Sequence, residues 1–235
     1  MKKLLLIVLA ALILSSCKTP NYGAGKEFNH VIEKPTGTEV ATYNGYVIEV
    51  TDDNIIRVKV PKKDEMIQKG WAINEEGIVK IALASIKLPT DNLPLSYETN
   101  TTVKKLLLDK EITLDIIEET ATSVSENSNP FNQIQGYIHL KDSNTTIQEV
   151  LIENGLAIID QSSPFVKSYL TELEKLQAVA QNKSVGVWAI DGFVNLNNTL
   201  GGHFTNATDL NEEEIQSIIK DIKAIGLDLE TIMNN

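Results

Sequence analysis

The sequence predicts an α+β fold, mainly β, in which a small five-stranded barrel carries about three packed helices and a C-terminal helical extension. Two observations predict it. The first half of the chain contains short segments with apolar residues at every second position, which is the spacing of strands. The second half contains segments with apolar residues at helical spacing. Strands that come first, with helices interleaved later, are typical of a small barrel with helices packed on it.

Five segments have strand character. The first two form a predicted hairpin, Tyr46–Val50 and Ile55–Val60, on either side of the turn residues Asp52, Asp53 and Asn54. The other three segments are Ile78–Ala84, Glu111–Glu118 and Gln135–Leu140.

Three segments between and after these strands have helical spacing. They are Tyr97–Leu108, Thr146–Asn154 with Gly155 as its stop, and Lys167–Ala180. A final helix is expected after the polar loop 199–207, with Asp209 or Asn211 as its cap and Gly226 at its end. Its apolar stripe consists of Ile215, Ile218, Ile219, Ile222 and Ile225.

The N-terminus has the features of a secretory signal. Lys2 and Lys3 precede an apolar run, Leu4–Leu14, that is too short to span a bilayer. The run ends in Leu14-Ser15-Ser16-Cys17, which resembles the bacterial lipobox, and Cys17 is the single cysteine of the chain. We therefore expect a lipoprotein signal over 1–17 and a lipid, with acyl chains such as palmitate, on Cys17. This places the protein at the extracytoplasmic face of a cell membrane; inner and outer bacterial membranes remain open.

Composition divides the rest of the chain. Residues 18–40 are rich in Thr, Pro, Gly and Asn and are expected to form a tether, followed by a domain over 41–192, a linker over 193–208 and a helical segment over 209–235. Loss of Lys2 and Lys3 with the leader leaves 19 basic residues against 32 acidic ones, a net charge of −13. So acidic a chain repels polyanions, which disfavours a nucleic-acid partner.

The order of these segments resembles the staphylococcal nuclease family over about residues 43–190. The most specific pieces are the stretch Gln148–Ala157, which ends in Gly155-Leu156-Ala157, and the Gly-x-Trp formed by Gly186 and Trp188. The acidic turn between Val47 and Val58 fits in length and position. This resemblance implies a five-stranded OB barrel with three helices and a calcium-dependent phosphodiesterase that uses carboxylates and two arginines.

The residues at the implied catalytic positions do not match that chemistry. Asn54 falls where the family has a metal-binding Asp, Ser85 falls at the second metal-binding Asp, and either Lys87 or Leu88 falls at the Glu that handles water. Lys80 and Gln133 stand in place of the two arginines. Removing one transition-state donor costs about 100- to 1,000-fold in rate, so joint replacement of these groups predicts a catalytically inactive domain.

Other residue types point to no strong site. Asp52 and Asp53 are weak candidates for a cation and ordinary turn formers. His30, His139 and His203 have no spaced metal partner and are expected to be structural or solvated. We therefore expect no cofactor, with calcium only if the domain is an active enzyme.

The sequence leaves three functions open. The first is a membrane-anchored lipoprotein whose inactive nuclease-like domain is a binding or scaffolding module for a protein or cell-envelope partner. The second is a calcium-dependent endonuclease that acts on extracytoplasmic nucleic acid. The third is an interaction protein that works through its C-terminal helix.

Overall fold

The computed structural model describes residues 40–90, 93–121, 133–140, 143–162, 165–196, 201–205 and 211–224. The expected leader, Cys17 and the tether up to residue 39 lie outside these residues. None of the helices in the described ranges is both long enough and apolar enough to cross a membrane.

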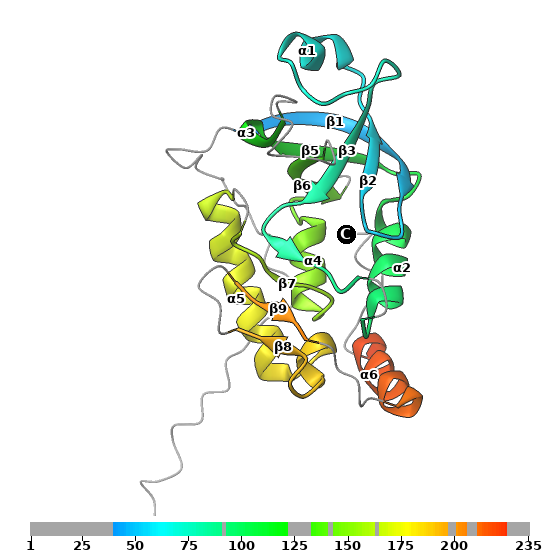
Figure 1. Cartoon of the computed structure of the whole chain (residues 1–235), viewed down its shortest axis with the longest axis vertical. Coiled ribbons are helices and arrows are strands. Elements are labelled where there is room, and N and C mark those ends of the chain that lie inside the picture. Colours follow the sequence, from blue (N-terminus) through cyan, green and yellow to red (C-terminus); the bar gives the residue numbers. More distant parts are fainter. Residues whose placement is uncertain are drawn as a thin grey trace, which may run out of the picture. The chain divides into compact units, whose positions relative to one another are not determined.

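Five strands close into a barrel in the order β1-β2-β3-β6-β5 (Figure 1). Neighbouring strands are antiparallel except for β3 and β6, which run parallel. The barrel confirms the five predicted strands and the mainly β fold class. Their bounds are β1 Val40–Val50, β2 Ile56–Lys59, β3 Ile78–Leu83, β5 Glu111–Ile117 and β6 Ile134–Leu140.

The barrel interior is filled by the alternate apolar residues of its strands. On β3 the buried set is Val79, Ile81 and Leu83, while Lys80 between them is exposed. On β5 the alternating residues Ile112, Leu114 and Ile116 are buried. A register shift between Val47 and Glu49 marks a bulge in β1, the feature that lets one long strand bend around a small barrel.

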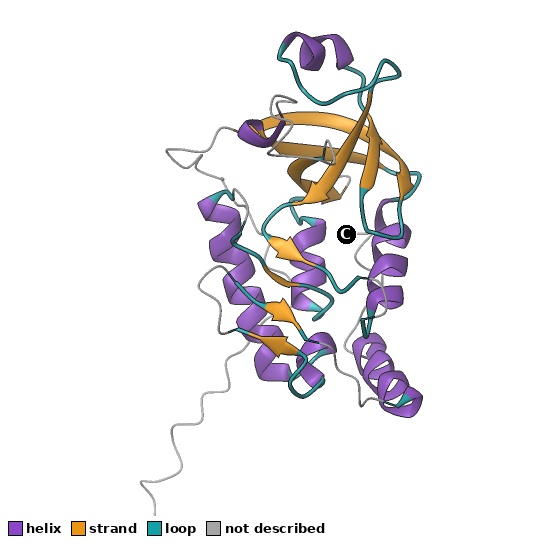
Figure 2. Ribbon diagram, in the orientation of Figure 1, coloured by secondary structure: helices purple, strands orange, loops and turns teal. Residues whose placement is uncertain are grey.

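The three helices predicted between and after the strands pack beside the barrel (Figure 2). α2 (Ser96–Leu107) contacts β1, and α4 (Ile147–Glu153) lies between β6 and α5 (Lys167–Lys183). Thr146 begins α4 with a capping box, because its hydroxyl accepts from the Glu149 N–H while the Glu149 carboxylate accepts from the Thr146 N–H. The buried faces of these helices carry their apolar residues at helical spacing: Val103 and Leu107 of α2, Val150 and Leu151 of α4, and Leu170 and Leu173 of α5.

Several short elements escaped the sequence analysis. They are α1 Lys63–Gln68, β4 Ile86–Lys87, α3 Glu118–Ala121, β7 Ile158–Ile159, η1 Gly186–Ala189, β8 Val194–Asn195 and β9 His203–Phe204. β8 and β9 pair within the stretch 193–208 that was expected to be a linker. Phe193 is fully buried there and stacks on Phe204 with ring centroids 5.0 Å apart, so this stretch packs on the domain.

The final helix, α6 (Glu212–Ala224), begins at one of its two predicted caps. The Asn211 side chain accepts from the Glu214 N–H, and the Glu214 carboxylate accepts from the Asn211 N–H, both at 3.0 Å. Ile219 is buried, and Ile215 and Ile218 pack half-buried against the core next to η1. The described part of the stripe is thus largely covered by the domain itself, which weighs against a free docking helix. Asp209, Ile225 and the side chain of Ile222 lie outside the described residues.

Candidate functional site

Asn54 occupies a tight position in the turn between β1 and β2. Its φ of 59° is left-handed, a conformation that Asn tolerates better than most residues, and the residue is 5% exposed. Its side-chain oxygen accepts a hydrogen bond from the Asn100 Nδ2 of α2 at 3.0 Å, and the same nitrogen donates to the Thr51 carbonyl at 2.8 Å. The oxygen at this implied metal position therefore fastens the turn to α2.

The two acids of the same turn face solvent. Asp52 has a 97% exposed side chain and pairs with Lys104 of α2 at 2.9 Å, and Asp53 is exposed. A surface pair of this kind contributes about 0–1 kcal/mol. Across the ranges that the structure describes, no group of three or more His, Cys, Asp or Glu side chains is arranged to hold a metal ion.

Ser85 is buried inside the fold rather than exposed at a surface. It is 1% exposed, has a φ of 65°, and its Oγ lies 2.5 Å from the Tyr137 hydroxyl of β6. That hydroxyl also accepts from the Val166 N–H, directly before α5, at 3.2 Å. Burial raises the pKa of Tyr137, so the group that Ser85 contacts is a neutral hydroxyl. Asn54 and Ser85 thus bond to different elements.

The remaining implied positions are spread over the barrel surface. Lys80 is exposed on β3, opposite Arg57 of β2. Lys87 is exposed on β4, and Leu88 beside it packs half-buried on the core. Gln133 is half-buried directly before β6. The side chains at these positions face solvent or pack on the core, and they do not come together in one cluster.

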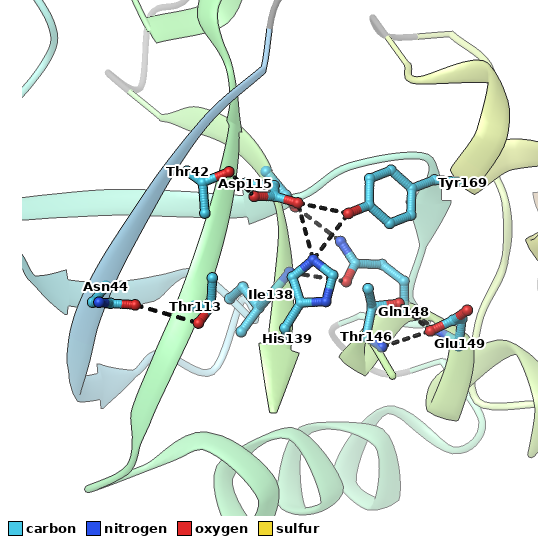
Figure 3. Close-up of polar contacts among 11 residues, drawn as sticks. Thr42, Asn44, Thr113, Asp115, Ile138, His139, Thr146, Gln148, Glu149 and Tyr169 are labelled. Carbon is cyan, nitrogen blue, oxygen red and sulfur yellow. Dashed lines mark hydrogen bonds and ion pairs between the residues drawn. The ribbon is translucent and has the colours of Figure 1, made fainter. Parts of the chain in front are cut away.

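A buried polar network that the sequence analysis did not find joins the outer face of the barrel to α5 (Figure 3). The Tyr169 hydroxyl donates to the Asp115 carboxylate of β5 at 2.6 Å, and Thr42 of β1 donates to its other oxygen at 2.6 Å. The His139 Nε2 of β6 lies 3.0 Å from Asp115 and 2.9 Å from the Tyr169 oxygen. Since the single hydroxyl hydrogen of Tyr169 points to Asp115, Nε2 carries a hydrogen and donates.

The charge state of this network follows from its bonds. Burial alone raises the pKa of Asp115, but hydrogen bonds from His139, Thr42 and Tyr169 outweigh burial and hold that pKa below its usual range. Burial, together with the bond to Asp115, raises the pKa of Tyr169 far above its usual range. The network thus consists of an ionised carboxylate, a neutral phenol and a largely buried imidazole that hydrogen bond to one another. Such a network has a structural role, because it links the barrel to α5.

The ring of Tyr137 links this network to Ser85. Tyr137 and Tyr169 stack with centroids 4.0 Å apart, and both belong to a second buried cluster, with Ala84, Ile117 and Val166, beneath the start of α5. The network could not be predicted from sequence spacing. His139 is 24 residues from Asp115 and 30 residues from Tyr169 along the chain.

Comparison with known proteins agrees with this fold. Residues 80–190 match a family described as staphylococcal nuclease homologues. Among solved structures, the extended Tudor domain of Drosophila melanogaster Tudor-SN (p100) is similar, with a TM-score of 0.50 and 12% identity over 64% of this chain and 100% of that chain. At that identity the likeness shows the fold alone. No curated protein matches the sequence.

Proposed function

We propose, from the premise that this chain carries a staphylococcal nuclease-like OB-fold domain, that the domain is a catalytically inactive binding or scaffolding module. In this proposal a lipid on Cys17 holds the module at the extracytoplasmic face of a cell membrane, where it meets a protein or cell-envelope partner. The two parts rest on different evidence and are tested separately.

One observation carries the proposal of inactivity. The two positions at which the family resemblance implies metal-binding carboxylates are occupied by neutral residues, Asn54 and Ser85, that are buried and hydrogen bonded to Asn100 and Tyr137. A cation at either position would meet a neutral, buried oxygen that is already hydrogen bonded, and would find no negative charge there.

Phosphodiester cleavage sets a demand that this arrangement does not meet. Negative charge accumulates around phosphorus in the transition state, so a divalent ion held by hard oxygen ligands must neutralise part of it. Arginines with paired donors take up the rest. Here Lys80 supplies one point charge and Gln133 none, while Lys87 or Leu88 replaces the residue that would activate water.

The membrane part of the proposal is supported by the sequence of residues 1–17. Each buried CH₂ of an acyl chain contributes about 0.8 kcal/mol, so two or more chains on Cys17 would hold the protein stably. An anchor with a folded module on a tether suits the capture of a partner near the membrane.

Calcium-dependent thermal unfolding tests the inactive-site proposal. A site with micromolar affinity would stabilise the folded state by about 2.7 kcal/mol at 100 times its dissociation constant, which raises the melting temperature by several degrees in a domain of this size. We expect melts in chelator and in millimolar calcium to coincide, with magnesium as the ionic-strength control. A calcium-specific rise of several degrees would contradict the proposal and support the enzyme.

A further inference from the structure

The chain between β2 and β3, residues 60–77, forms a wall beside β3. Residues 60–77 contain α1 and then return along β3, where Ile73 forms an isolated bridge with Val79. Trp71 is 6% exposed and packs edge-on to Tyr43 at 5.5 Å, and the Ala72 N–H donates to the Ala121 carbonyl at 2.9 Å. The side-chain oxygen of Asn74 stabilises the turn that leads into β3, because it accepts hydrogen bonds from the Glu76 and Ile78 N–H groups. Backbone hydrogen bonds to β3 and to Ala121 therefore hold this segment in place.

Two cations face this wall from neighbouring strands. Arg57 and Lys80 are register partners on β2 and β3, so their side chains leave the same face of the sheet about 5 Å apart. Like charges directly opposite each other destabilise a sheet. Glu49 pairs with the Arg57 Nη1 at 2.7 Å, but Lys80 has no ion-pair or hydrogen-bond partner in the described part of the chain. The buried Nε of Arg57 likewise has no acceptor among these residues. Arg57, Lys80 and Glu49 together therefore carry one net positive charge, in a protein that is acidic as a whole.

The wall and the two cations line an open-sided cavity of about 370 Å³. Trp71, Ile73 and Ile78 line it with apolar surface, and Arg57 and Lys80 line it with charge. Its volume lies within the range of small-molecule sites, about 300–1,000 Å³. Neither Asn54 nor Ser85 lines the cavity. The site therefore lies apart from the two implied metal positions, but it includes Lys80, which stands in place of one implied arginine.

We propose that this cavity binds a small ligand whose anionic oxygen group, a carboxylate or a phosphate, is attached to an apolar body. Lys80 and the free side of the Arg57 guanidinium receive the anionic group, and Trp71, Ile73 and Ile78 cover the apolar body. This inference deepens the binding role proposed above and rests on it.

Binding of aryl anions to the full chain tests the inference. Phenyl phosphate and phenylacetate are titrated while Trp71 fluorescence is followed in the Trp188→Phe variant, since Trp71 and Trp188 are the two tryptophans of the protein. We expect saturable binding of at least one aryl anion, and the tighter of the two identifies the anionic group. Inorganic phosphate, which lacks the apolar body, and benzyl alcohol, which lacks the charge, should bind at least tenfold more weakly.

Charge variants complete the test. In the Trp188→Phe background, Lys80→Gln should weaken aryl-anion binding about tenfold or more, because it removes a charged hydrogen-bond donor. The matched control Lys105→Gln removes an exposed lysine of α2 and should leave binding unchanged. Absence of saturable binding, equal affinities in the two lysine variants, or equal binding of benzyl alcohol or inorganic phosphate would overturn the inference. Each of these results is distinct from a failure of the calcium test, which concerns Asn54 and Ser85.

Discussion

At the scale of single residues, neutral hydrogen bonds occupy the places where the family resemblance implies charge. Ser85 and Asn54 each use a side-chain oxygen to join two elements. Asp115, a buried carboxylate on the outer face of the barrel, is hydrogen bonded by three donors. Breaking a buried network by removing one partner costs more than the network contributes net, because the other groups lose their partners. We therefore expect substitutions of these residues to lower the stability of the folded domain.

Asp115→Asn tests the tie between the barrel and α5. We expect a loss of about 2–3 kcal/mol at pH 7, because the Asn amide offers one neutral oxygen in place of a charged carboxylate and turns its NH₂ donor toward groups that donate to Asp115. The folded-state pKa of Asp115 lies below its unfolded value of about 3.9, so its contribution is present above about pH 4 and is lost as pH falls through the folded-state pKa.

Urea unfolding at pH 7 and near pH 3 measures both effects. The difference between wild type and Asp115→Asn should shrink at the lower pH. The control Asp53→Asn changes an exposed turn residue and should cost little at either pH. Equal stability of Asp115→Asn and wild type at pH 7 would show that the network does not hold α5.

At the scale of elements, the two motifs that carry the family resemblance touch each other. The Val187 N–H donates to the Gly155 carbonyl at 2.8 Å, so the end of α4 and the start of η1 meet backbone to backbone. Both Gly155 and Gly186 have positive φ, at 63° and 58°. A Cβ on Gly155 would collide with the Val185 carbonyl, and one on Gly186 would collide with the Gly155 carbonyl. Glycine is required at both positions by conformation and by space.

Gly155→Ala is therefore expected to destabilise the domain by about 3 kcal/mol or more, from left-handed strain plus the forced separation of α4 and η1. Gly192→Ala is the matched control, because Gly192 also has a positive φ, 67°, but a Cβ there meets nothing within 4 Å. The control should cost only the strain, about 1–2 kcal/mol. Chemical denaturation of both variants separates strain from collision, and equal losses would refute the close-contact explanation.

The sequence predicted the elements that are long enough to show a period. Alternation in β5 and helical spacing in α2 and α5 identified the residues that the structure buries. It missed α1, which has a single buried residue, Met66, and strands of two residues such as β4 and β8, because neither length carries a period. The polar network escaped for a related reason: Asp115 lies on the outward face of β5 and is buried only because α5 covers it. Burial of a residue by a helix that is distant in sequence does not appear in the local pattern of apolar and polar residues.

At the scale of the whole molecule, the proposed lipid anchor would hold an acidic domain at a membrane surface, and the charge of that domain makes it poorly suited to nucleic acid. With the expected leader removed, a net charge of −13 opposes approach to polyanions at long range. The proposed attachment to the membrane is through Cys17.

Cys17→Ser tests the attachment. The variant should lose incorporation of a fatty-acid analogue in growing cells, and it should either leave the membrane fraction or remain unprocessed at higher mass. Ser16→Thr, which keeps the cysteine, is the control for handling of the leader. Wild-type protein without label in a strain that labels another lipoprotein would exclude the lipid anchor.

The central claim, that the nuclease-like domain is inactive, is tested most directly by a nuclease assay on purified wild-type protein. Single-stranded and double-stranded DNA and RNA are incubated with millimolar calcium and, in parallel, with chelator. We predict no calcium-dependent cleavage above background and no difference between wild type and Asp52→Ala. Calcium-dependent cleavage that Asp52→Ala abolishes would contradict the claim, because it would require Asp52 to hold a metal that Asn54 and Ser85 are not placed to share.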